Sequence, residues 1–91
     1  FDWDDANRAH IARHGVTPVE AGHIVLGASL PLDTEERSGE DRHTELGETT
    51  EGLLPLAVWT WRRHRIRVVT AFPANQKWRA LWKRLKGEHN A

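Results

Sequence analysis

The chain has 91 residues, of which 38% are hydrophobic and 29% are charged, and its formal net charge is zero. This length and composition predict one small globular domain, residues 1–91, and exclude a disordered tail. The absence of cysteine excludes a disulfide scaffold, a cysteine-based zinc site and a thiol nucleophile. We expect a cytoplasmic protein without a membrane segment, because no apolar run approaches the roughly 18 residues of a membrane span and residues 1–4 do not resemble a secretory signal.

Charge is segregated along the chain although its total is zero. Residues 33–51 contain eight acidic and two basic residues, which gives −6, whereas residues 62–86 contain nine basic and no acidic residues, which gives +9. A basic surface of this kind attracts phosphate groups. A competing interpretation is that both blocks are merely solvated surface. The acidic segment, in turn, either shields the basic surface or forms a solvated loop.

A first helix is predicted after a short strand at 1–3. Asp4 or Asp5 can cap this helix, because a carboxylate there accepts hydrogen bonds from unpaired backbone N–H groups. The helix is expected over 6–14, and Gly15 ends it in a left-handed conformation.

A second helix is predicted directly afterwards. Thr17 and Glu20 have the spacing of a capping box, and Pro18 occupies the first helical position, where proline is favoured. The helix is expected to continue to about Leu26 and to end at Gly27.

The middle of the chain predicts an antiparallel sheet of three to five strands. Apolar and β-branched residues place strands at 30–32, 42–47, 53–61 and 65–72. The strand at 30–32 is expected at an edge, because Pro31 cannot donate a hydrogen bond to a central ladder. The connecting segments are a loop at 33–41, a turn at 48–52 and a hairpin at 62–64.

A C-terminal helix is predicted after a cap at Asn75, ending at Gly87. Its apolar residues recur at helical spacing and form one stripe that can pack on the sheet: Trp78, Leu81, Trp82 and Leu85. The order of elements predicts an α+β fold, with two N-terminal helices, a mostly antiparallel sheet and a C-terminal helix whose tryptophans dock on it.

Alternation along the strand at 65–72 suggests a binding surface. Ile66, Val68, Thr70 and Phe72 are expected on one face, and Arg65, Arg67, Val69 and Ala71 on the other. If helices cover the first set, two guanidinium groups stand on the open face and, with bases of the C-terminal helix, form a cradle for phosphate oxygens. The alternative is that these arginines only keep an edge strand soluble.

Other polar residues give weaker indications. His10 and His14 could share a helix face as metal ligands, but no third ligand or zinc-protease motif accompanies them, and no metal site is predicted. His43 and His64 could exchange protons near neutral pH or be plain surface residues. The aspartates at 2–5 are interpreted as helix caps rather than as a carboxylate metal site. The tryptophans could stack on nucleobases, although core packing is the commoner role.

Several segments occur in the order and spacing of a known family. They are Phe1-Asp2-Trp3-Asp4, Ala12-Arg13-His14-Gly15-Val16, Gly39-Glu40-Asp41-Arg42, Gly47 and Ile66-Arg67-Val68-Val69-Thr70-Ala71. Over nearly its whole length the chain resembles the BrnT family, the toxins of BrnT–BrnA type II toxin–antitoxin pairs. The resemblance implies a RelE-like ribonuclease fold and a toxin that blocks translation by cleaving RNA. It also implies a BrnA-type antitoxin with a ribbon-helix-helix domain, so that DNA is bound only through the antitoxin.

The implied reaction uses no metal ion and no cofactor. The 2′-hydroxyl attacks the adjacent phosphate, and the enzyme stabilises the added negative charge and moves protons. The resemblance assigns charge stabilisation to Arg67 and Arg42 and a proton-transfer role to His14 or His43. The expected RNA-binding residues are Arg65, Lys77, Arg79 and Lys83.

The chain departs from the family pattern at two places. Family members often carry an arginine after the segment that ends at Ala71, where this chain has Phe72. Their C-terminal helix often contains a Glu-Arg pair, where this chain has Trp78-Arg79. These differences support an alternative function, a catalytically weak or inactive domain that binds the antitoxin or nucleic acid.

Overall fold

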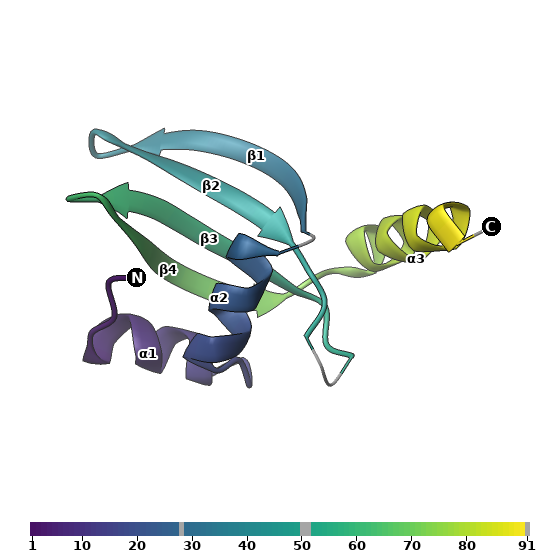
Figure 1. Cartoon of the computed structure of the whole chain (residues 1–91), viewed down its shortest axis with the longest axis horizontal. Coiled ribbons are helices and arrows are strands. Elements are labelled where there is room, and N and C mark those ends of the chain that lie inside the picture. Colours follow the sequence, from purple (N-terminus) through teal and green to yellow (C-terminus); the bar gives the residue numbers. More distant parts are fainter. Residues whose placement is uncertain (28, 50–51, 91) are drawn as a thin grey trace.

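A computed structural model describes residues 1–27, 29–49 and 52–90. The elements in chain order are α1 (Asp5–Ala12), α2 (Pro18–Leu26), β1 (Leu30–Arg37), β2 (Glu40–Leu46), β3 (Pro55–Arg62), β4 (Arg65–Pro73) and α3 (Gln76–Asn90). The four strands form one sheet in the order β1-β2-β3-β4, and every neighbouring pair is antiparallel (Figure 1). The predicted α+β class and its order of elements are therefore confirmed.

The predicted caps position both N-terminal helices. The Asp4 carboxylate accepts a hydrogen bond of 3.0 Å from the Asn7 backbone N–H, and the Asn7 side chain accepts one of 2.8 Å from the Asp4 N–H. Thr17 and Glu20 form the same reciprocal arrangement at α2. Gly15 has the expected positive φ, +74°, a conformation in which a side chain would be strained.

The N-terminal segment and the acidic segment differ from the prediction. Residues 1–3 form no strand, although the Asp2 N–H donates to the Ile66 carbonyl at 2.8 Å. The loop predicted at 33–41 is wrong, because β1 continues to Arg37 and β2 begins at Glu40. Ser38 and Gly39 make the turn with φ values of +52° and +80°, as two-residue hairpins require. Backbone hydrogen bonds alone can hold an edge hairpin together. Its side chains are charged, so the sequence lacks the apolar alternation from which a strand is predicted.

A β-bulge changes the predicted alternation in β4. Val58 pairs with Thr70 and Trp59 pairs with Val68, which leaves Val69 as an extra residue. Beyond the bulge the faces therefore exchange, and Thr70 and Phe72 share a face with Arg65 and Arg67 rather than with Val68. The parity predicted for the second half of β4 was wrong, whereas that for Arg65 and Arg67 was right.

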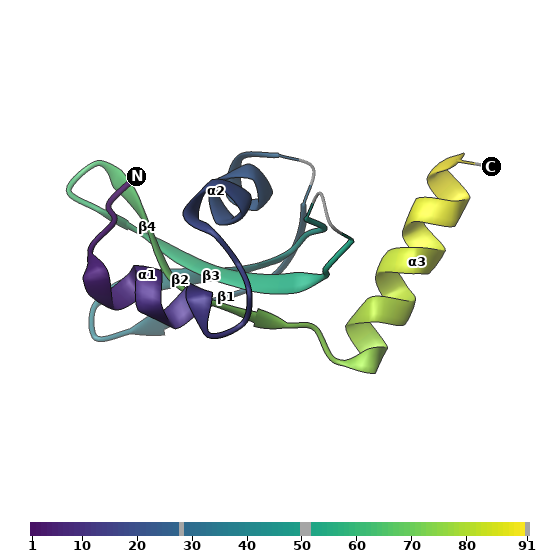
Figure 2. The same ribbon diagram turned by 90° about the horizontal axis from the view of Figure 1, so that it is seen from below.

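The two faces of the sheet are covered by different elements. α1 lies along β4, and α2 lies over β3 and β2 (Figures 1 and 2). The sheet face toward α2, called the α2 face below, carries the first apolar cluster, formed by Ile11, Val16, Ala21, Val68 and Ala71 with Trp3, Val25 and Trp59 packed against it. The opposite face, called the far face, carries a second cluster, formed by Leu46, Leu54, Leu56 and Ala74 with Leu30, Leu32, Phe72, Trp78 and Trp82 packed against it.

Helix α3 packs on the sheet only near its start. Asn75 caps it by accepting a hydrogen bond of 3.0 Å from the Trp78 N–H, and Trp78 and Trp82 lie against the second cluster, as predicted. Leu85 is 37% exposed, and the helix continues past the predicted stop at Gly87. The helix projects beyond the end of the sheet (Figure 2). Within the described residues, no helix is long and apolar enough to cross a membrane.

Candidate functional site

The register of the sheet brings two predicted arginines together on the far face. Arg67 in β4 pairs with Thr60 in β3. Arg42 precedes His43, which pairs with Trp59, so alternation places Arg42 beside Thr60. Thr60 is 1% exposed and its hydroxyl donates to the Asp41 carbonyl at 2.7 Å, which ties β3 to β2 at this row. Arg42 and Arg67 therefore flank a fixed residue on the same face.

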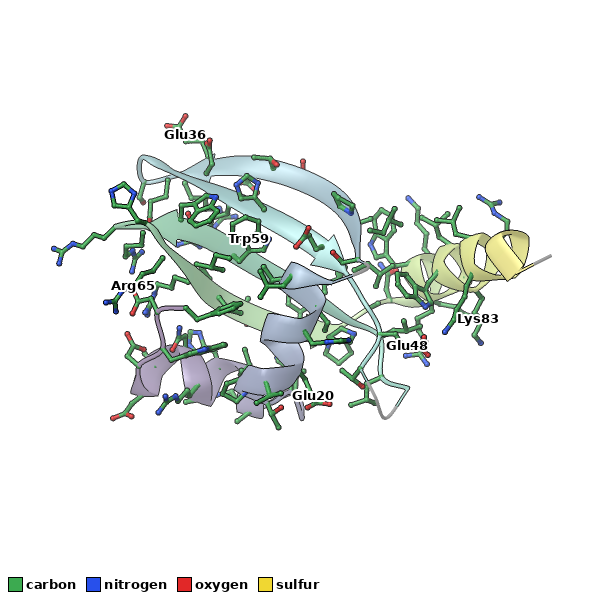
Figure 3. The ribbon with its side chains drawn as sticks, viewed as in Figure 1. Glu20, Glu36, Glu48, Trp59, Arg65 and Lys83 are labelled. Atoms are coloured by element: carbon green, nitrogen blue, oxygen red, sulfur yellow. The ribbon has the colours of Figure 1, made fainter. Side chains whose placement is uncertain are left out.

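Two further arginines lie on this face beside the β3–β4 hairpin. Arg62 and Arg65 are the last pair before the turn, and Figure 3 shows Arg65 at that end of the sheet. Arg63 and His64 form the turn with φ values of +51° and +66°. The four side chains Arg42, Arg62, Arg65 and Arg67 are called the arginine cluster below.

Arg67 is held by the segment that precedes α1. Its guanidinium lies 2.8 Å from the Asp4 carboxylate and 3.6 Å from the Asp2 carboxylate, and its side chain is only 14% exposed. The Asn7 backbone N–H, and to a smaller extent the Arg67 guanidinium, lower the pKa of Asp4, although partial desolvation opposes them. Arg67 is thus a positive charge with a restricted orientation.

Arg62 is held by Glu40 across the sheet. Two hydrogen bonds, from Nε at 3.1 Å and from Nη2 at 2.8 Å, join its guanidinium to the carboxylate. This pairing lowers the pKa of Glu40 and raises that of Arg62 above its ordinary value. The charges of Arg42 and Arg67 also lower the pKa of Glu40, which indicates that three arginines act on one carboxylate.

Arg42 and Arg65 differ from these two because neither is in an ion pair with another described residue. Among the described residues, no carboxylate lies within ion-pair distance of either guanidinium. The Nε of Arg42 is buried and lacks a hydrogen-bond partner within this part of the chain. Arg65 is exposed. A planar guanidinium without a carboxylate partner is suited to bind phosphate oxygens.

The two candidate histidines lie elsewhere. His43 is on the α2 face, where its Nδ1 is 3.0 Å from the Thr34 hydroxyl and its ring is 4.5 Å from that of Trp59. His14 follows the C-terminal end of α1, whereas Asp4 contacts Arg67 at the other end of this helix. The eight helical residues between them span about 12 Å. The structure therefore does not bring either histidine to the arginine cluster.

The remaining predicted RNA-binding residues are on α3. Arg79 and Lys83 line a shallow hollow with Gln76 and Ala80, and the Lys77 ammonium lies 5.1 Å from the centre of the Trp78 ring. Lys83 and Arg65 lie at opposite ends of the molecule in Figure 3. The expected single cradle of strand and helix bases is therefore divided into an arginine cluster and a separate basic helix.

The ion-pair partners of the arginines were missed in the sequence. From the sequence alone the carboxylates at positions 2 and 4 indicate only helix caps, and Glu40 falls in the loop predicted at 33–41. The cross-strand pairing of Glu40 with Arg62 follows only when β2 is known to begin at Glu40. Among the described residues, no three metal-ligating side chains are grouped to hold a metal ion.

The two departures from the family pattern are neighbours in space. Phe72 and Trp78 both pack against the second cluster, on the same face as the arginine cluster but at the other end of β4. Six residues of strand separate Arg67 from Pro73, which corresponds to about 20 Å. An apolar surface thus occupies the end of the far face next to α3.

Comparison with known proteins supports the resemblance seen in the sequence. The family model for the ribonuclease toxin BrnT of type II toxin–antitoxin systems matches residues 3–77. No curated protein and no solved structure matched the chain. The matched region contains the whole arginine cluster and two of the three carboxylates that pair with it, Asp4 and Glu40. The chain belongs to the BrnT family of ribonuclease toxins of type II toxin–antitoxin systems.

Proposed function

We propose that the chain is an endoribonuclease toxin that cleaves RNA without a metal ion and thereby inhibits translation. The observation that carries this proposal is the arginine cluster on the far face of a chain that belongs to a ribonuclease toxin family. Its neutralising partner is an antitoxin of the BrnA type with a ribbon-helix-helix domain, through which the complex binds DNA.

The arginine cluster would stabilise the charge that develops on the phosphate. When the 2′-hydroxyl attacks, the phosphate gains negative charge, and fixed donors stabilise this charge more than mobile ones because they need no reorganisation. Arg67 supplies a fixed charge, since Asp2 and Asp4 restrain it. Arg42 and Arg65, which lack carboxylate partners among the described residues, supply the direct contacts to phosphate oxygens.

The RNA strand would continue from the arginine cluster toward α3. Arg79 and Lys83 are exposed on this helix, and an exposed basic side chain adds salt-sensitive affinity without sequence preference. Proton transfer by His14 or His43 is not supported by the positions of these residues, which lie away from the cluster. Their roles are therefore tested separately from those of the arginines.

The decisive experiment is RNA cleavage by the purified chain with and without a chelator. Cleavage that persists in chelator is expected, and Arg67→Ala should lower its rate by about 10²–10³-fold, because one preorganised charge stabiliser is lost. Arg13→Ala is a matched control, since Arg13 is exposed at the other end of α1 and should leave the rate unchanged. Arg65→Ala repeats the test at a position whose side chain is exposed and not in the core.

In cells, expression should arrest growth, co-expression of the cognate antitoxin should relieve the arrest, and Arg67→Ala should abolish it. Unchanged toxicity of folded Arg67→Ala and Arg65→Ala would remove the cluster from the mechanism. Cleavage that stops in chelator would contradict the metal-free scheme.

The second candidate function is binding of the antitoxin without catalysis. The observation that favours it is the packing of Phe72 and Trp78 in one apolar cluster at the end of the far face, where the family pattern has charged residues. This function predicts a stable complex with the antitoxin and no RNA product at any ratio of protein to RNA.

A further inference from the structure

A large aromatic side chain is exposed beside the β3–β4 hairpin. Trp61, near the end of β3, is 57% exposed on the α2 face, although it pairs with Ile66 in the antiparallel ladder of β3 and β4. Its position lies beyond the first apolar cluster, which includes Trp59 but not Trp61. The ring therefore contributes little to the core and leaves most of its surface available to a ligand.

The ring of Trp61 is supported from one side. It meets the ring of Trp59 edge to face, with centroids 5.7 Å apart and planes at 79°. Trp59 is itself fixed, because its indole N–H donates to the Glu45 carboxylate at 2.8 Å and its ring lies 4.5 Å from His43. A supported ring loses little conformational entropy when a planar ligand stacks on it.

The hairpin that follows Trp61 carries cationic residues. Arg63, His64 and Arg65 are all exposed, and the arginine cluster begins directly on the other face of the same hairpin. Asp41 at the neighbouring end of β2 and its cross-strand partner Glu36 in β1 are acidic residues on this side of the sheet. The excess of positive charge at the turn favours a polyanionic ligand over an apolar protein segment.

We propose that Trp61 is a stacking site for an unpaired nucleobase of single-stranded RNA. The sugar–phosphate backbone would pass over Arg63 and Arg65 at the hairpin and reach the arginine cluster on the far face. This inference rests on the proposed function, since it takes the ligand to be RNA. Stacking on tryptophan tolerates every base, because each base has a π-face, so the site adds affinity rather than sequence preference.

The test is the affinity of the full chain for a short single-stranded RNA with 2′-O-methyl groups, which binds but is not cleaved. Trp61→Ala should weaken binding by about 5- to 150-fold, the range that corresponds to loss of one base–aromatic stack. Trp61→Phe should retain most of the affinity, because a phenyl ring still stacks. Val19→Ala is the matched control: Val19 is 82% exposed on α2 and should not affect binding.

An RNA series with a single abasic site, moved along the strand, separates stacking from a general loss of affinity. At one position the abasic site should weaken binding to the unaltered chain, and it should have little further effect on Trp61→Ala. Equal affinity of Trp61→Ala and the unaltered chain overturns the inference and leaves the proposed function standing. If Trp61→Ala instead loses the antitoxin and keeps RNA, the ring is a protein contact and the inference fails. If the unaltered chain binds no RNA, the proposed function fails with it.

Discussion

Asp4 has two structural roles that most side chains at a helix start do not combine. Its carboxylate caps α1 through the Asn7 N–H and also lies 2.8 Å from Arg67. The cap fixes the carboxylate, and the carboxylate in turn restrains the guanidinium. The orientation of a cluster arginine is thus linked to the folding of the first helix.

Asp4→Asn separates these roles, because asparagine caps helices about as well as aspartate but carries no charge. We expect only a small decrease in the urea midpoint, because the cap is kept and an ion pair to a half-exposed carboxylate contributes little. Affinity for uncleavable RNA should rise by up to about fivefold, since one negative charge leaves the cluster, while kcat should fall because Arg67 is no longer restrained. Asp5→Asn is the control for charge, since Asp5 makes no ion pair with Arg67. Identical kcat and affinity in the two variants would contradict the positioning role.

At the scale of elements, helix α3 is anchored mainly by two rings at its start. Trp82 packs on the second cluster and donates its indole N–H to Glu48 at 3.3 Å, and Lys86 contacts the same carboxylate at 2.6 Å. Glu48 follows β2 and thus connects the helix to the end of the sheet (Figure 3). The later turns contribute less, as the exposure of Leu85 indicates.

Trp82→Ala should therefore destabilise the fold by about 2 kcal/mol. Replacing a fully buried tryptophan by alanine costs about 3–5 kcal/mol of stability, and this ring is only half-buried. Trp82→Phe should lose only about 1 kcal/mol, the net value of a typical hydrogen bond. The measurement is urea unfolding of each variant. Leu85→Ala on the same helix should change stability by under about 0.5 kcal/mol, and an equal loss in Leu85→Ala and Trp82→Ala would show that α3 packs along its whole length.

Elements with a local signal were predictable from the sequence. Thr17 and Glu20 reveal the cap of α2, and the spacing of Trp78 and Trp82 reveals the packed side of α3. The extension of β1 has no such signal, because an edge strand with exposed side chains shows no apolar alternation. The bulge at Val69 depends on pairing with β3, and the contact of Asp2 with Arg67 depends on where α1 lies. Contacts of this kind join residues far apart in the sequence, so no local sequence pattern reveals them.

At the scale of the whole molecule, positive and negative segments are interleaved rather than separated. The acidic hairpin β1–β2 lies beside the basic hairpin β3–β4 in one sheet, and Glu40 joins them through Arg62. Glu48 likewise joins the acidic segment to α3 through Lys86. The acidic residues of β1 and β2 are therefore part of the folded sheet, and Glu40 and Glu48 partly neutralise the basic residues.

This arrangement predicts loss of stability in acid. The pKa values of Asp4, Glu40 and Glu48 are lowered in the folded chain from ordinary values of 3.8 and 4.5. These carboxylates contribute their full stabilisation of the fold above their ordinary pKa values. The stabilisation is lost as the pH falls through the lowered pKa values, because the unfolded chain binds protons at higher pH than the folded chain. The urea midpoint should therefore decrease below pH 4.5. In Glu40→Gln the decrease should be smaller, and a midpoint that stays constant to about pH 3 would contradict the assignment.

The extra residue in β4 has a consequence for how the sequence can vary. Because Val69 stands outside the regular pairing, the strand consists of two halves whose inward and outward positions are set independently. The half with Arg67 can keep its charged residues while the half with Phe72 changes from charged to aromatic residues, or the reverse. In either case each side chain stays on the same face of the sheet. One strand can thus lose or gain a polar end in evolution while its other end continues to serve the ligand.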